Sequence, residues 1–242
     1  MSRFEFLHPV IFYAPVFIYA LWLMVRYRSM TLPALANPSI FAGGAVGERK
    51  SDVFELAGPY AASFIAPSTT LTPYGSPAEQ LEQASKAMDV AQIAFPIVAK
   101  PDTGLRGSGV RPIHSTDELA TYLTDFPAGH RIMLQKKVPY SAEAGIFYIR
   151  HPDQAKGSIF SLTMKYTATV EGDGKRTLAE LIDACPRCKR MGPVYLQRHA
   201  GRLKEVLPAG EVFALNFAGN HAKGSIFRDG QAHICDALTD VV

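Results

Sequence analysis

Short apolar runs alternate with polar, glycine-containing connections from residue 76 to the end of the chain. Helix starts are predicted where a Ser or Thr is followed three residues later by Glu, the arrangement of a capping box. These starts are Ser76, Ser115 and Thr177, and the first helix is expected to run to about Ile93. The pattern predicts an α+β fold whose second half contains mainly antiparallel strands. The lengths and composition of the apolar runs predict strands at 95–101, 110–113, 131–138, 145–150, 157–170 and 211–217.

Turn residues complete this outline. The pair Asp229-Gly230 is favoured in tight turns, so residues 225–235 are predicted to form a hairpin. The stretch that precedes residue 76 is rich in Pro, Gly, Ser and Ala and is interpreted as a connector, with one short helix at 51–56. The predicted organisation is a hydrophobic helix within 1–29, a connector at 30–75 and a folded domain at 76–242.

The N-terminal region differs from the rest in its hydrophobicity. Residues from Pro9 to Val25 form an uncharged run of 17, followed by Arg26 and Arg28. As a helix this run is about 25 Å long, at the short limit for crossing a bilayer. If it inserts, the arginines place the remaining chain in the cytoplasm. The alternative is a buried or interfacial helix, so membrane association through 9–25 stays an open prediction.

Composition excludes several classes of protein. The 242 residues are 48% hydrophobic, so the chain is not wholly disordered. The net charge is +3 without a dense run of Lys or Arg, which argues against nucleic acid as the main partner. Three cysteines do not form a disulfide framework and favour a reducing, cytoplasmic compartment.

The most informative stretch for function joins two predicted strands at 95–113. Lys100 lies at the end of the first strand and supplies a point charge suited to a phosphate. A glycine-containing loop follows, whose backbone N–H groups can approach an anion closely. The alternative is a β-hairpin turn that uses glycine for its geometry alone. The loop residues singled out for anion binding are Thr103, Gly104, Gly107, Ser108 and Gly109.

Residues further along the chain are consistent with a nucleotide cleft. The strand 133–138 changes from apolar to polar, which suits the edge of an adenine base. Glu143 precedes the next strand, and Lys165 lies at the end of the one after it. Together these segments predict apolar walls for a base and scattered cations for phosphates.

The order of these motifs resembles the ATP-grasp superfamily. The turn Gly172-Asp173-Gly174 before Thr177-Leu-Ala-Glu-Leu-Ile, and Asn220-His-Ala-Lys-Gly224, look especially like its cyanophycin-synthetase and D-alanine–D-alanine-ligase branch. The resemblance covers about 76–242 and implies two α+β subdomains that hold a nucleotide between them. The segments that match are FPIVAKP (95–101), TGLRGSGV (103–110), MLQKKV (133–138), EAGIFYIRHP (143–152), SLTMKYTATVEGDGKRTLAELI (161–182) and LNFAGNHAKGSIFRDG (215–230).

The resemblance implies ATP and Mg²⁺ as cofactors and assigns roles residue by residue. Lys100 contacts phosphates beneath the loop 103–109, and Gln135, Lys136 and Val138 border adenine. Glu143 lies near the ribose or on the strand that leads to it. Arg150 and Lys165 face the transferring phosphoryl group or the acyl-phosphate as catalytic residues. Asn220 and Lys223 occupy a loop that faces phosphate or substrate. The implied reaction phosphorylates a small-molecule carboxylate and then joins the acyl-phosphate to an amine.

The chain departs from the family at the metal. The family holds magnesium with an acidic residue on a late strand and a Glu-x-Asn element, and no Glu-x-Asn occurs in these 242 residues. Asp236 and Asp240 do not reproduce that spacing and are interpreted as part of a helix start. The metal ligands are therefore unknown. We expect either a C-terminally truncated chain, which is the favoured explanation, or a protein that binds nucleotide without efficient turnover.

Other motifs receive simpler interpretations. Cys185-Pro-Arg-Cys188 is a single Cys-x-x-Cys pair and is interpreted as packing at a helix end rather than as a zinc site completed by Cys235 and His199 or His221. The aromatic residues Phe147, Tyr148 and Phe160 are predicted to lie in the core. Three hypotheses on function follow: a carboxylate–amine ligase, a non-catalytic membrane-associated nucleotide-binding protein, and a membrane-tethered scaffold without a ligand.

Overall fold

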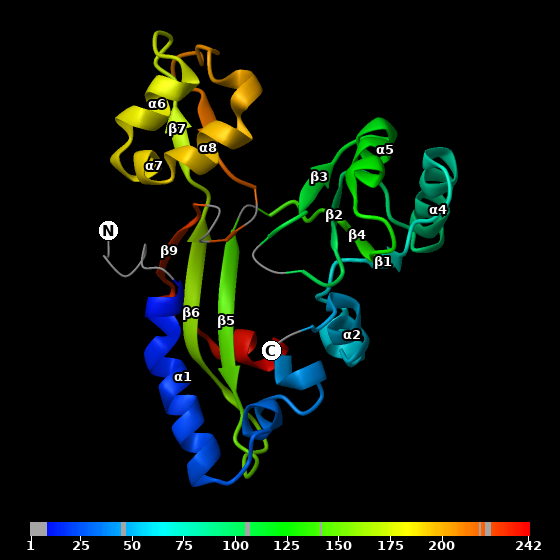
Figure 1. Ribbon diagram of the computed structural model, residues 1–242, viewed down its shortest axis with the longest axis vertical. Helices are drawn as coiled ribbons and strands as arrows, with labels where there is room; N and C mark the ends of the chain where they lie inside the picture. Colours follow the sequence, from blue (N-terminus) through cyan, green and yellow to red (C-terminus); the bar gives the residue numbers. More distant parts are fainter. Residues whose placement is uncertain (1–8, 45–46, 105–106, 141, 218, 221–223) are drawn as a thin grey trace. The chain divides into compact units, whose positions relative to one another are not determined.

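The computed structural model describes residues 9–44, 47–104, 107–140, 142–217, 219–220 and 224–242 (Figure 1). The chain divides into two units, Met1–Leu56 and Ala57–Val242. The second unit therefore begins inside the segment 30–75 that the sequence suggests is a connector. The described strands form three antiparallel sheets, as expected for an α+β fold.

The first unit contains helical segments. They are α1 (Pro9–Arg26), η2 (Leu32–Ala36), η3 (Phe41–Gly44) and α2 (Lys50–Glu55). Large apolar side chains of α1 from Val10 to Val25 are exposed, among them Phe17 and Trp22. Within the described part of the chain, no helix combines the length and the apolar character that crossing a membrane requires.

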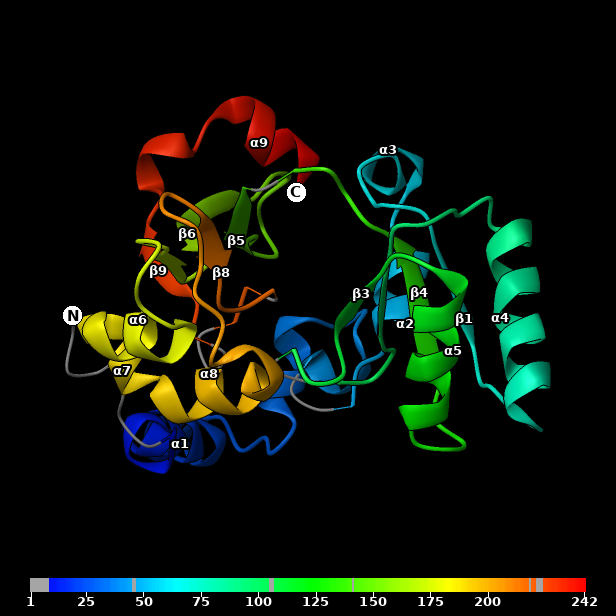
Figure 2. The same ribbon diagram turned by 90° about the horizontal axis from the view of Figure 1, so that it is seen from above.

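The second unit begins with sheet A, which has the strand order β1-β4-β2-β3. Its members are β1 (Ser68–Leu71), β2 (Ile97–Pro101), β3 (Arg111–Ile113) and β4 (Ile132–Lys136). Helices α4 (Pro77–Val90) and α5 (Thr116–Asp125) lie on one side of this sheet (Figure 2). The short helix α3 (Pro59–Ala62) precedes β1.

Strand alternation separates the two faces of sheet A. Side chains of alternate residues point to opposite faces. The first face provides Ile97, Ala99, Ile132 and Leu134 to a buried cluster. That cluster also contains Ala84 and Met88 of α4 and Leu119, Tyr122 and Leu123 of α5. The opposite face therefore presents Val98 and Lys100 of β2 beside Met133 and Gln135 of β4.

Helices α4 and α5 begin where the sequence predicts. At α4, the Ser76 side chain accepts a hydrogen bond from the Glu79 amide, and the Glu79 carboxylate accepts one from the Ser76 amide at 2.7 Å. At α5 the box is half formed, because the Glu118 carboxylate accepts from the His114 amide instead, at 2.8 Å. The helix from Ser76 ends at Val90, three residues before Ile93.

Sheet B has the order β5-β6-β9, made of β5 (Glu143–Ile149), β6 (Ser158–Tyr166) and β9 (Ile226–Asp229). The predicted hairpin at 225–235 is wrong, because β9 pairs with β6 and is followed by η6 (Gln231–His233). Gly230 has a φ of −116°, outside the positive region that a tight hairpin turn requires. Its amide instead donates to the Leu162 carbonyl, at 2.9 Å. Helix α9 (Asp236–Val241) begins at Asp236, as expected for a helix start.

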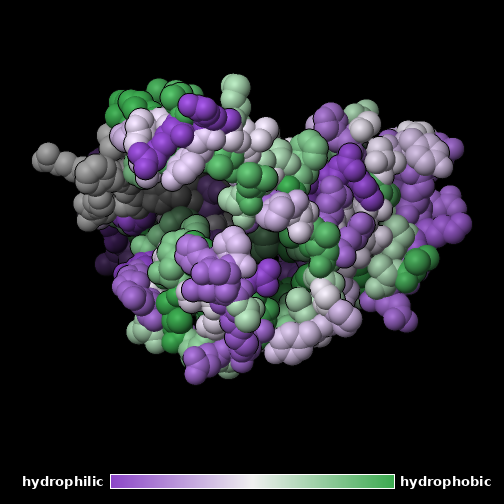
Figure 3. Space-filling view, turned by 90° about the horizontal axis from the view of Figure 1, so that it is seen from below, coloured by the Kyte–Doolittle hydropathy of each residue, from purple (hydrophilic) through white to green (hydrophobic). Residues whose placement is uncertain are grey.

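The aromatic residues of sheet B are not core residues, contrary to the prediction. Phe147 is 54% exposed and Phe160 is 61% exposed, with their ring centroids 5.9 Å apart. Tyr148 is 36% exposed, and its hydroxyl accepts a hydrogen bond from the Gly157 amide at 2.8 Å. In Figure 3, hydrophobic residues in green likewise reach the surface among hydrophilic ones. An apolar strand pattern shows which side chains are hydrophobic, but it does not show whether another part of the protein covers them.

A third assembly surrounds the small sheet C, formed by β7 (Thr169–Glu171) and β8 (Val212–Ala214). Its helices are α6 (Leu178–Ala184), α7 (Pro186–Arg190), α8 (Gly192–Arg198) and η4 (Ala200–Arg202). The buried residues include Val170, Leu178, Cys188, Tyr195 and Leu215. This second cluster includes Leu215, directly after β8, and Tyr195, whose hydroxyl donates to the Gly224 carbonyl ahead of β9.

Candidate functional site

Two of the predicted nucleotide-binding residues meet on the face of sheet A opposite α4 and α5. The register pairs Lys100 with Met133, so Gln135 lies one side-chain position further along the same face. The Lys100 Nζ atom donates a hydrogen bond to Gln135 Oε1 at 2.6 Å. Gln135 Nε2 in turn donates to the Ala66 carbonyl at 2.9 Å. The pairing of β2 with β4 therefore brings together a cation and an amide that are 35 residues apart in sequence.

The glycine-containing loop follows β2 directly. Thr103, Gly104, Ser108 and Gly109 are exposed, and residues 105 and 106 of the loop lie outside the described residues. Gly107 and Gly109 each have a φ of +69°, a conformation that residues with a side chain rarely adopt. A Cβ atom on Gly109 would lie 2.9 Å from Cγ of Pro101. Both positions need glycine for backbone geometry, and Gly109 also needs it for the close approach to Pro101, whatever the loop binds.

Tyr122 of α5 anchors the end of this loop. Its hydroxyl donates to the Gly109 carbonyl at 2.9 Å. Burial raises the pKa of Tyr122 to about 12, against a smaller opposing effect of Arg111. The hydroxyl therefore stays protonated at neutral pH and keeps its role as a donor.

A buried carboxylate at the base of the loop escaped the sequence analysis. The Asp102 side chain is fully buried, and its Oδ2 atom lies 3.7 Å from Nε of Arg131. The Asp102 amide donates to the Arg131 carbonyl at 3.0 Å, and Arg131 Nη2 donates to the Thr70 hydroxyl at 2.8 Å. The position of Asp102 between a strand and a glycine loop could have marked it in the sequence. Its partner Arg131 could not be predicted, because the pairing of β2 with β4 brings the two residues together.

The predicted adenine-bordering residues lie at the end of β4. Lys136 is exposed, and its amide donates to the Pro67 carbonyl at 2.9 Å. Val138 is 49% exposed. The segment is therefore fixed through its backbone while these two side chains remain accessible to a ligand.

A second group of predicted residues lies on sheet B. Glu143 and Lys165 are directly opposite each other on β5 and β6, and Lys165 Nζ lies 2.9 Å from Glu143 Oε1. Gly219 approaches this pair so closely that a Cβ atom there would collide with the Glu143 carboxylate. Asn220 follows and is half-buried, whereas Lys223 lies outside the described residues.

Arg150 is not part of this group. It follows the last residue of β5, whereas Glu143 is the first residue of that strand and pairs with Lys165. A rise of about 3.4 Å per residue separates the two ends of β5 by roughly 20 Å. The structure therefore does not bring together the two residues that were predicted to be catalytic.

Two buried polar residues support the Asn220 segment. The Asn216 Oδ1 atom accepts from the Ala168 amide at 3.0 Å, and its Nδ2 atom donates to the Ser225 hydroxyl at 2.8 Å. The Ser225 amide donates to the Asn220 carbonyl at 3.1 Å. No sequence pattern pointed to Asn216 or Ser225, because their pairing spans a loop.

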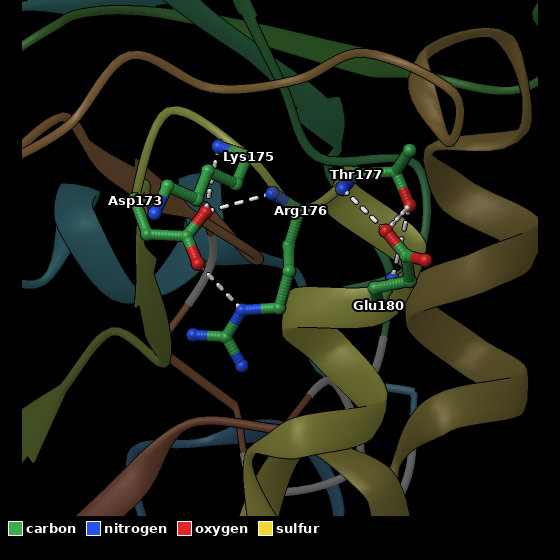
Figure 4. Close-up of polar contacts among 5 residues, drawn as sticks. All are labelled: Asp173, Lys175, Arg176, Thr177 and Glu180. Atoms are coloured by element: carbon green, nitrogen blue, oxygen red, sulfur yellow. Dashed lines mark hydrogen bonds and ion pairs between the residues drawn. The ribbon is translucent and has the colours of Figure 1, made fainter.

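The turn at Asp173 is held by its own carboxylate (Figure 4). Asp173 accepts from the amides of Arg176 and Lys175 and from Nε of Arg176, at 2.7–2.9 Å. The Arg176 amide is the main cause that lowers the pKa of Asp173 far below its ordinary value. The following capping box of Thr177 and Glu180 is fully formed, which confirms the predicted start of α6.

The acidic residues of these regions do not fit a magnesium ion held by the protein. Of the residues that the structure describes, no three His, Cys, Asp or Glu side chains are grouped to hold a metal. Nearby carboxylates have other partners: Glu143 pairs with Lys165, and Asp229 accepts from the Gln231 amide. Mg²⁺ prefers a near-octahedral set of oxygen ligands, which these separately paired carboxylates do not offer.

The comparisons with known proteins found weak structural likenesses. No protein-family model matches the chain, and no curated protein matches it in sequence. A bifunctional glutathione synthetase from Pasteurella multocida is 16% identical, with a TM-score of 0.31 over 73% of this chain and 24% of that one. A D-cycloserine synthetase is 12% identical, with a TM-score of 0.34 over 75% of this chain and 46% of that one. The chain spans less than half the length of either protein, and TM-scores this low carry no inference about its function.

Proposed function

We propose that this chain is an ATP-binding protein of the ATP-grasp type, from the class of ATP-dependent carboxylate–amine ligases. The observation that carries the proposal is the Lys100–Gln135 pair beside the glycine-containing loop. A cation for phosphate and an amide for a base edge, both half-buried, lie together on one face of sheet A, beside a loop that contains the exposed residues Thr103, Gly104, Ser108 and Gly109. The sequence resemblance assigns the same residues to a nucleotide.

The chain's own residues would bind ATP in a simple exchange. Lys100 transfers its hydrogen bond from Gln135 to a phosphate oxygen, forming a stronger charge-assisted bond. Gln135 is then free to bind the edge of adenine with its amide oxygen. Thr103, Gly104, Gly107, Ser108 and Gly109 supply N–H and hydroxyl donors, and Lys136 and Val138 border the base. ATP would transfer its terminal phosphoryl group to a small-molecule carboxylate, which releases ADP and gives an acyl-phosphate. An amine would then attack the acyl carbon, with phosphate as the leaving group.

Sheet B would contribute to the reacting end of the nucleotide. Lys165 provides positive charge for the transferring phosphoryl group, and Glu143 holds the ammonium group in place and lies near the ribose. Asn220 and Lys223 contact phosphate or substrate. Arg150, at the other end of β5, would act on a different part of the substrate from Lys165.

A second candidate function is nucleotide binding without turnover. It is favoured by a specific observation: Asp102, Glu143 and Asp229 each have a partner within the chain. A metal would then depend on the nucleotide's own oxygens. Both candidates share the ATP site on sheet A, and ADP formation distinguishes them.

Calorimetric titration of the full chain with ATP and magnesium tests the shared site. We expect saturable binding that Lys100→Ala weakens at least about tenfold, the effect of losing a hydrogen bond to a charged group. The matched control is Lys86→Ala, because Lys86 is exposed on α4, against the other face of sheet A. Absence of binding by the folded chain would contradict both candidates. ADP formation in the presence of carboxylic acids and amines would support the ligase. ATP binding without ADP formation would support the second candidate.

A further inference from the structure

The Cys-x-x-Cys pair is disulfide-bonded, a feature that the nucleotide site does not explain. Cys185 and Cys188 are joined across the junction of α6 and α7. Cys188 is buried in the cluster around sheet C, whereas Cys185 is partly exposed. The third cysteine, Cys235, is free and exposed at the start of α9. Cys185 therefore lies at the edge of the buried cluster, whereas Cys188 is part of it.

The disulfide stabilises a helix that is too short to be stable alone. Helix α7 has five residues, below the length at which helices persist in water without tertiary support. Its N-cap is Cys185, whose sulfur accepts from the Cys188 amide at 3.2 Å. Sulfur is a weak acceptor, so this cap contributes little by itself. The covalent bond between the same two residues holds the first turn of α7 closed.

Helix α7 passes directly into α8, which contacts the predicted substrate loop. Met191 ends α7 and precedes α8, in which Tyr195 is buried. The Tyr195 hydroxyl donates to the Gly224 carbonyl at 3.0 Å. A Cβ atom on Gly224 would collide with that hydroxyl, so the two residues are in close contact. Burial raises the pKa of Tyr195, which keeps the hydroxyl protonated as a donor.

We propose that Cys185–Cys188 is a thiol–disulfide switch that controls the order of the Gly224–Ser225 turn through Tyr195. With the disulfide intact, α7 and α8 are fixed and Tyr195 holds the Gly224 carbonyl. Reduction leaves the weak sulfur cap on α7, and the Tyr195 hydrogen bond is lost more often. Ser225 binds the Asn220 carbonyl, so the switch reaches a predicted substrate-facing residue; that last consequence alone rests on the proposed function.

The reductant is a dithiol, and the exchange balances within the two molecules. A thiolate of the dithiol attacks Sγ of Cys185, and the S–S bond breaks to release the Cys188 thiolate. The second thiol of the dithiol then displaces Cys185 and closes its own disulfide. Two electrons pass to the protein, and the two thiol protons of the reductant end on Cys185 and Cys188.

Hydrogen exchange of the full chain tests the switch without any nucleotide. The background variant is Cys235→Ser, which leaves a single cysteine pair, and dithiothreitol is the reductant. We expect the peptide that contains Gly224 and Ser225 to exchange about fivefold to tenfold faster after reduction, the effect of losing one typical hydrogen bond. Trypsin should also cleave faster at Arg187, Lys189 and Arg190 of α7.

Two further variants make the route specific. Tyr195→Phe removes the hydroxyl but keeps the ring, so it should abolish the redox effect at Gly224 and Ser225 while the trypsin response of α7 persists. Cys185→Ala with Cys188→Ala should show no response to dithiothreitol and should resemble the reduced protein, because neither variant residue caps α7 strongly. Equal exchange at Gly224 and Ser225 in the two redox states, with or without a response of α7, would overturn the proposal. So would a cysteine pair that never oxidises. Because no readout uses ATP, these outcomes are independent of the nucleotide site.

Discussion

Sheets A and B are both antiparallel and both present a lysine that is paired to a neighbouring strand, but they differ in what stabilises them. One face of sheet A packs on α4 and α5 around a buried cluster. Among the described residues, neither buried cluster includes a side chain of sheet B, although Ile159 and Leu162 are buried individually. The difference suggests that sheet A is a self-supporting layer, and that sheet B depends on its ends and on neighbouring segments.

The lysines follow the same contrast. Lys100 donates to a neutral amide, and a charge-assisted bond to a phosphate oxygen is stronger than this one. Lys165 is bound by the Glu143 carboxylate, so a phosphate must compete with an opposite charge. We therefore expect sheet A to determine the affinity for a nucleotide more than sheet B does.

The largest expected effect comes from the core of sheet A. Leu134→Ala removes a side chain with no exposed area and should lower the free energy of unfolding by about 3 kcal/mol. Phe160→Ala on sheet B should lower it by less than about 1 kcal/mol, because the ring is largely exposed. Urea denaturation measures both, and equal losses would show that the two sheets do not differ in this way.

Buried and exposed ion pairs provide the next comparison. Asp102→Ala leaves Arg131 without its buried partner and should cost about 2 kcal/mol. Glu143→Ala breaks a half-exposed pair on sheet B and should cost about 0.5 kcal/mol. The same urea titrations decide the order, and a larger loss for Glu143→Ala would contradict the comparison.

Helix caps should have a smaller effect. Ser76→Ala removes the side-chain acceptor of a complete capping box at α4 and should cost about 1 kcal/mol. Ser115→Ala at α5, where the box is half formed, should cost less. Thermal unfolding of both variants measures the two losses of stability. Equal losses would contradict the expectation that a half-formed capping box stabilises its helix less than a complete one.

The smallest expected effect is the loss of stability at acidic pH that comes from the two capping glutamates. Hydrogen bonds from Ser76 lower the pKa of Glu79, and those from Thr177 lower the pKa of Glu180, below the ordinary value of 4.5. A lowered pKa in the folded state stabilises the protein above pH 4.5, and this support is lost as the pH falls through the folded pKa. The urea midpoint should therefore decrease on acidification, and less so in Glu79→Gln. An unchanged pH response in that variant would exclude Glu79 as a contributor.

The sequence predicted helix starts more accurately than it predicted which side chains are buried by distant parts of the chain. The capping boxes at Ser76 and Thr177 form as expected, because each depends on residues three positions apart. The hairpin after Asp229 does not form, because the Gly230 amide is drawn to the Leu162 carbonyl, a distant partner. Phe147 and Phe160 are exposed for a similar reason: burial depends on what lies above a strand.

The candidate site shows the same division. The sequence by itself determined which residue types are available: a lysine ending a strand, a glycine-containing loop and an amide about 35 residues later. Only the tertiary structure decided that Lys100 meets Gln135, that Asp102 faces Arg131 and that Arg150 lies at the other end of β5 from Lys165. The physical reason is that strand register sets these distances, and register results from packing summed over a whole sheet.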